Sequence, residues 1–73
     1  MENQLRKQIK KLLLEEDVKL YELAQALTDK TGRAYSATAL SHRIGRASIT
    51  YQEMLIIAEI LGYEIKFVKK ANN

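Results

Sequence analysis

Apolar residues recur along most of the chain at the spacing of helical faces. The first set, at i, i+4, i+7 and i+8, comprises Leu5, Ile9, Leu12 and Leu13. This spacing places the four side chains on one side of a helix. The acidic run at 15–17 interrupts the pattern, so we expect this helix to end near residue 15. Residues 18–27 carry a second set of the same kind, which comprises Leu20, Leu23, Ala24 and Leu27.

Two further helices are predicted from residues that can cap them. Ser36 is a favourable N-cap for a third helix, because its hydroxyl can accept a hydrogen bond from a free backbone N–H. Either Ser48 or Thr50 begins a fourth helix, and Glu53 follows Thr50 at the spacing of a capping box. A broad apolar face comes next, and Gly62 is expected to end that helix in a left-handed conformation.

The remaining segments are predicted to be a turn and a strand. Residues 28–35 have the composition of a turn, in which Gly32 is expected to have a positive φ. From residue 63 to 69 apolar and charged residues alternate, which is typical of a β-strand. The alternating apolar residues are Tyr63, Ile65 and Phe67. We expect a frayed tail at 71–73.

A single predicted strand needs a partner for its backbone groups. The chain offers no second strand-like run, so the simplest partner is the same strand of a second copy, which would make a symmetric homodimer through Tyr63, Ile65 and Phe67. The alternative is an extended tail whose aromatic side chains pack on the helices. The fold class expected is mostly α, with four to five short helices and one C-terminal β-strand, in a single domain over residues 1–73.

Composition excludes several classes of protein. The 73 residues are 47% hydrophobic, which favours a packed core over disorder. Residues 1–30 lack the pattern of a signal peptide, and no apolar run approaches the ~18 residues that span a bilayer, so we expect a soluble, cytoplasmic protein. The chain has no cysteine and one histidine, which argues against a disulfide and a zinc site. It also lacks a nucleophile–base pair and a glycine-rich phosphate loop, so we expect no cofactor, no small-molecule substrate and no enzymatic activity.

The net charge of +3 is unevenly distributed. No carboxylate occurs between Asp29 and Glu53, and the basic residues in that interval are Lys30, Arg33, His42, Arg43 and Arg46. Such a basic block suits a surface that faces phosphates, and the alternative is a chance cluster of solvated charges. The first helix also carries basic residues, namely Arg6, Lys7, Lys10 and Lys11. These are interpreted as a solvated face, with phosphate contact as the alternative.

The third helix has an unusual outer side. Leu40 and Ile44 define its inner side, and the opposite side holds Thr38, Ser41, His42, Gly45 and Arg46, with Ala39 at the edge. These short or polar groups could lie in a DNA major groove without holding the helix away from the base edges.

With this order of helices, the chain resembles the Cro and repressor family of phage-type (lambda-repressor-like) helix-turn-helix proteins. The residues that carry the resemblance are "ELAQAL", "ATALSHRIGR" and "ITYQEMLIIAEILGYEI". The resemblance implies a small transcriptional regulator, such as a repressor, that binds double-stranded DNA as a homodimer. It also implies that bases are read by residues at the start and outer face of the recognition helix, namely Ala37, Thr38, Ser41 and His42.

The chain departs from this family in the turn. Eight residues separate Leu27 from Ser36, whereas the family's turn has about three or four. Either the second helix runs longer or the loop carries an insertion. The glutamine that the family often has at the start of the second helix is absent, and Leu20 stands near that place. The acidic residue that the family usually has near the end of the recognition helix is also missing.

Several residues outside the base-reading set are candidates for phosphate contact. They are Lys30, Arg33, Tyr35, Arg43 and Arg46. Arg43 lies toward the flank of the buried side, so we expect it to contact a phosphate or a carboxylate of the same chain rather than a base. His42 is either a donor to DNA or a bystander on a solvated face. The alternative function is a protein-interaction modulator that keeps this fold and does not bind DNA.

Overall fold

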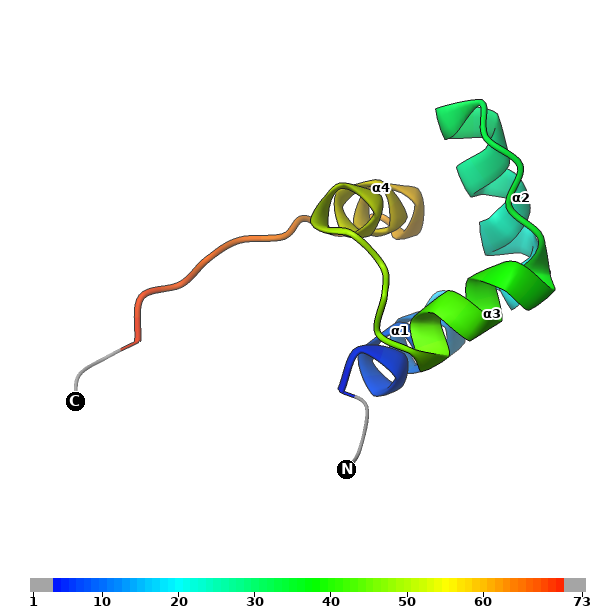
Figure 1. Cartoon of the computed structure of the whole chain (residues 1–73). Helices are drawn as coiled ribbons and strands as arrows, with labels where there is room; N and C mark the ends of the chain where they lie inside the picture. Colours follow the sequence, from blue (N-terminus) through cyan, green and yellow to red (C-terminus); the bar gives the residue numbers. More distant parts are fainter. Residues whose placement is uncertain (1–3, 71–73) are drawn as a thin grey trace.

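The computed structural model describes residues 4–70, which form four α-helices joined by short loops (Figure 1). The helices are α1 (Gln4–Glu15), α2 (Leu20–Thr31), α3 (Ala37–Gly45) and α4 (Tyr51–Leu61). The mostly helical class and the end of the first helix at residue 15 are therefore confirmed. The tail predicted at 71–73 lies outside the described residues.

The residues that cap the helices act as the sequence predicts. The Ser36 hydroxyl oxygen accepts a hydrogen bond from the Ala39 backbone N–H, with 3.0 Å between the heavy atoms. Thr50 and Glu53 form a reciprocal capping box at the start of α4. Gly62 follows α4 with a φ of +85°, a conformation that costs a residue with a Cβ more than it costs glycine. Thr50, rather than Ser48, is thus the N-cap of α4.

The long turn is explained by a longer second helix. Because α2 extends to Thr31, only residues 32–36 connect it to α3. Gly32 begins this loop with the expected positive φ of +76°. The Tyr35 backbone N–H donates to the Thr28 hydroxyl oxygen at 2.9 Å, which ties the end of the loop to α2.

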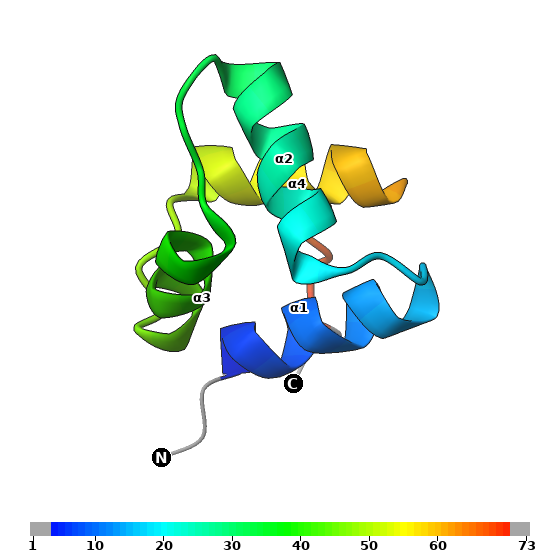
Figure 2. The same ribbon diagram turned by 90° about the vertical axis from the view of Figure 1, so that its right-hand side faces the viewer.

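The core lies where α2 crosses the other helices. Figure 2 shows α2 in the middle, with α4 behind it, α3 to one side and α1 below. The core side chains are Ile9, Leu23, Ala24, Leu27, Leu40, Ile44, Ile57 and Leu61. Ala24 is buried at the centre of α2, where its small side chain allows neighbouring helices to approach closely. None of the helices in residues 4–70 has the length and apolarity required to cross a lipid bilayer.

The predicted strand at 63–69 is wrong for the single chain, because the described residues contain no β-strand. A strand requires a neighbouring strand to hydrogen-bond its backbone, and the described chain supplies none. Residues 64–70 make no backbone–backbone hydrogen bond within residues 4–70. They instead leave α4 as an extended segment that points away from the helices (Figure 1). The ring centroids of Phe67 and Tyr51 lie 6.2 Å apart. Phe67 is nevertheless 87% exposed, so this contact does not pack the tail against the helices as the alternative expected.

Candidate nucleic-acid interface

The outer side of α3 is open to solvent. Leu40 is 0% exposed and Ile44 is 6% exposed, which confirms the prediction that these two residues define the inner side of the helix. The outward residues Thr38, Ala39, Ser41, His42, Gly45 and Arg46 are all exposed, and Ala37 is half-buried. The C-terminal segment runs away from this helix (Figure 1) and does not cover it. Over its whole length α3 therefore presents a surface of short and polar groups.

Two of the candidate phosphate contacts lie away from this surface. The Lys30 ammonium pairs with Glu59 of α4 at 3.4 Å, and both side chains are largely exposed. Arg33 and Lys30 line a hollow between the end of α2, the loop and the start of α4. The structure thus does not bring Lys30 or Arg33 to the outer side of α3.

Arg43 and Tyr35 both contact the carboxylate of Glu53. The guanidinium of Arg43 donates to Glu53 Oε2 at 2.6 Å and to Oε1 at 2.5 Å, which makes a bidentate ion pair. It also donates to the backbone oxygen of Ser48 at 3.2 Å. The Tyr35 hydroxyl donates to Glu53 Oε2 at 2.8 Å. Arg43 therefore makes the intrachain carboxylate contact that the sequence left as one of two alternatives.

This network holds the charge of Glu53 in a buried position. The side chain of Glu53 is 9% exposed. The hydrogen bonds from Arg43 lower its pKa to about 2, with burial opposing them and the Thr50 backbone N–H and the Tyr35 hydroxyl adding to them. Burial raises the pKa of Tyr35, as does the neighbouring Glu53 carboxylate. The ion pair joins the inner flank of α3 to the first turn of α4 and so fixes the direction in which α3 points.

The side of α3 that faces α1 is basic. One shallow hollow is lined by Arg6, Ser41, His42, Gly45 and Arg46. A second, adjoining hollow is lined by Arg6 and Lys10 of α1 together with apolar residues and Ser41 of α3. Among the described residues, no carboxylate lines either hollow. The sequence had identified the basic residues of α1, but it could not show that Arg6 and Lys10 come next to α3.

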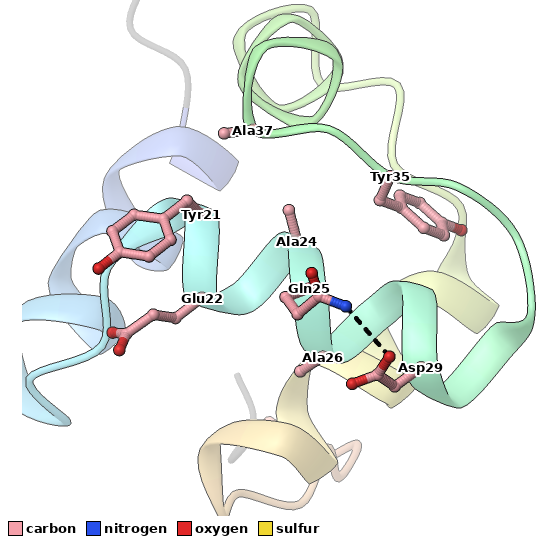
Figure 3. Close-up of a pocket in the computed structure, with 8 residues that line it drawn as sticks. All are labelled: Tyr21, Glu22, Ala24, Gln25, Ala26, Asp29, Tyr35 and Ala37. Atoms are coloured by element: carbon pink, nitrogen blue, oxygen red, sulfur yellow. Dashed lines mark hydrogen bonds between the residues drawn. The ribbon is translucent and has the colours of Figure 1, made fainter.

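On the side of α3 that faces α2, a hollow includes two carboxylates of α2. A hollow of about 540 Å³ lies between α2 and the start of α3 (Figure 3). Figure 3 shows Glu22 and Asp29 at opposite ends of its α2 side and Ala37 across from them. Gln25 donates to Asp29 Oδ1 at 3.1 Å along the exposed surface of α2. The hollow on the α2 side of α3 thus includes carboxylates, whereas the two hollows on the α1 side include cations and no carboxylate. A linear sequence does not reveal this difference.

Comparison with known proteins identifies no relative for this arrangement. No protein-family model matches the chain, and no curated protein or solved structure matches it either. The function must therefore be inferred from the geometry of the described residues.

Proposed function

We propose that this chain is a sequence-specific double-stranded DNA-binding protein, a small transcriptional regulator of the Cro and repressor kind. In this proposal α2, the loop and α3 act as a helix-turn-helix, and α3 enters the major groove. The observation that carries it is the exposed outer side of α3, which is polar and free of long side chains along nine residues. A helix with such a side can approach base edges closely.

The proposal gives each residue near this surface a role. Thr38, Ser41 and His42 offer hydrogen-bonding groups to base edges, and Ala37 offers a methyl group that can contact thymine. Arg46, at the end of α3, contacts a phosphate or a guanine. Arg43 and Tyr35 act indirectly, since their polar groups already contact Glu53.

We further propose that the protein binds as a homodimer through the C-terminal segment. Phe67 is 87% exposed and Tyr63 is 39% exposed, although both residues are aromatic. The backbone of residues 64–70 has no backbone partner in the described chain. Pairing two copies of this segment, with Ile65 between the two aromatic residues, would satisfy those groups and cover the exposed rings. Two α3 helices would then read half-sites about one helical turn apart.

The test is selection of binding sites from a pool of randomised duplexes, followed by titration at several salt concentrations. We expect Thr38→Ala and Ser41→Ala to relax the preference at individual base pairs by about 1–3 kcal/mol each. We expect Arg46→Ala to weaken binding to all duplexes, if it contacts a phosphate, and to reduce the salt dependence. Gln52→Ala is the matched control, because Gln52 is exposed on α4. Failure of the unaltered protein to bind any duplex at ~50 mM salt would refute the proposal.

A protein-interaction modulator is the second candidate. It is favoured by the ion pairs of Lys30 with Glu59 and of Arg43 with Glu53, because they remove two cations of the central basic block from phosphate binding. A partner held by this protein after nuclease treatment and at high salt would support it, since phosphate contacts weaken steeply with salt.

A further inference from the structure

We propose that α1 supplies the main contacts to the DNA backbone, through Arg6 and Lys10. Arg6 and Lys10 line one hollow between α1 and α3, and Arg6 lines the adjoining hollow with Arg46, the residue after α3. We call these two hollows the cationic groove and infer that it takes neighbouring phosphates of one DNA strand. The inference rests on the proposed function and deepens it. It moves the phosphate contacts away from Lys30 and Arg33, where the sequence alone placed them.

Two basic residues of α1 lie on the side of that helix that faces α3. Arg6 and Lys10 are i, i+4 neighbours, which places them on one side of the helix about 5–6 Å apart at their Cβ atoms. That side adjoins the buried Ile9, and both residues line the hollow that also contains Ser41 and Ile44 of α3. Lys7 and Lys11 are displaced around the helix by about 100° from Arg6 and Lys10, respectively, and line neither hollow.

The cationic groove continues onto the side of α3 that we propose reads bases. Arg6 lines a hollow with Ser41, His42 and Arg46, so its side chain lies beside residues that we assign to DNA contact. A strand whose bases face α3 must place its phosphates along one flank of the helix. On the α1 flank those phosphates would meet two guanidinium groups, that of Arg6 and that of Arg46, and the ammonium of Lys10, which is the composition that phosphate binding requires.

The hollow on the other side of α3 is less suited to phosphates, because it includes carboxylates. Glu22 and Asp29 line the hollow between α2 and the start of α3 (Figure 3). Glu22 Oε1 also accepts the Lys19 backbone N–H at 2.8 Å, so a carboxylate of the chain already occupies the N-terminal end of α2. The positive end of that helix, which otherwise attracts an anion, is thereby neutralised. We therefore expect the DNA backbone to lie on the α1 side of α3.

Three single variants test the inference: Arg6→Gln, Lys10→Gln and the matched control Lys11→Gln. All three remove one positive charge from an exposed residue of the same helix. Binding to a selected duplex is measured by fluorescence anisotropy between 50 and 200 mM salt, and circular dichroism verifies that the helices remain folded. Each phosphate contact contributes about 0.9 to the slope of log K against log salt. We expect the slope to fall by about that amount for Arg6→Gln and for Lys10→Gln, and to stay unchanged for Lys11→Gln.

A second measurement identifies the phosphate. Neutral methylphosphonates are placed one at a time along each strand of the duplex. We expect one position beside the bases read by α3 at which this replacement weakens binding of the unaltered protein but has no further effect on Arg6→Gln. If Arg6→Gln retains the slope of Lys11→Gln, or if every methylphosphonate affects Arg6→Gln as it affects the unaltered protein, the inference is refuted and the proposed function stands. If the unaltered protein binds no duplex, the proposed function fails and this inference fails with it.

Discussion

Replacing the buried Glu53 with glutamine should destabilise the fold far more than the loss of an exposed carboxylate would. The Glu53 carboxylate accepts hydrogen bonds from Arg43, Tyr35 and the Thr50 backbone. Glutamine keeps nearly the same shape and one acceptor oxygen, but it loses the negative charge. Glu53→Gln therefore tests the charge of this network with little change in packing.

The magnitude follows from the pKa of Glu53. Its pKa is lowered from 4.5 to about 2 in the folded protein, chiefly by the hydrogen bonds from Arg43. At about 1.36 kcal/mol for each pKa unit, this corresponds to about 3 kcal/mol of stability at neutral pH. The Arg43 side chain is 34% exposed and can be rehydrated when its partner is lost, so we expect a loss of about 2 kcal/mol. For a domain of this size that loss lowers the melting temperature by roughly 10 °C.

The assay is thermal unfolding at several pH values, with Glu59→Gln as the control. Glu59 is also on α4 and also pairs with a cation, but that pair is largely exposed and is expected to contribute less than about 1 kcal/mol. Because the pKa of Glu53 is lower in the folded state, the unfolded state binds more protons between pH 4.5 and pH 2. The stability of the unaltered protein should therefore decrease as the pH falls through this range, and Glu53→Gln should lack that part of the decrease.

Two results would refute this reasoning. One is a melting temperature for Glu53→Gln at pH 7 that equals that of Glu59→Gln. The other is the same dependence of stability on pH, between pH 5 and pH 2, in Glu53→Gln as in the unaltered protein. Either result would mean that the charge of Glu53 does not stabilise the contact between α3 and α4.

Two more predictions concern the end of α4 and the segment that follows. If the proposed dimer forms, sedimentation equilibrium should give the mass of two chains for the unaltered protein and of one chain for Phe67→Glu. The helix content should not fall, because Phe67 is 87% exposed in the single chain; a mass of one chain for the unaltered protein, or of two chains for Phe67→Glu, would contradict the proposed pairing. Gly62→Ala should lower the free energy of unfolding by about 1–2 kcal/mol, because Gly62 has a φ of +85°. Gly45→Ala is the control, since Gly45 lies in α3 without a positive φ and alanine is favoured there; equal losses for the two variants would show that backbone strain is not the cause.

The features that the sequence predicted correctly depend on short stretches of chain. Ser36 and Thr50 begin their helices because each can satisfy an N–H group three residues later. Gly32 and Gly62 adopt positive φ values at helix ends, where glycine has the lowest cost. Periodicity likewise sufficed to predict that Leu40 faces the core. These effects act over one or two helical turns, so the local sequence determines them.

The features that the sequence missed depend on pairs of distant residues. Alternation at 63–69 showed a segment able to form a strand, but a strand also needs a partner, and the described chain supplies none. Glu53 was identified as a capping residue, yet its contacts with Arg43 and Tyr35 span 10 and 18 residues. The basic residues between Asp29 and Glu53 were likewise predicted to form one surface, because the sequence does not show which distant carboxylates approach them. Carboxylates of α4 in fact pair with two of its cations.

The network around Glu53 also explains how α3 can have so bare an outer side. A helix of nine residues is unstable alone, and threonine, serine, histidine and glycine are poor helix formers. Its buried side chains are Leu40 and Ile44, which is a small contact for a helix that must hold a fixed direction. The bidentate pair of Arg43 with Glu53 adds a directional contact on the flank of α3, where it needs no space on the outer side. The ion pair on the flank and the buried Leu40 and Ile44 therefore hold α3 in place. The residues on its outer side are not needed for stability and can serve contacts with another molecule.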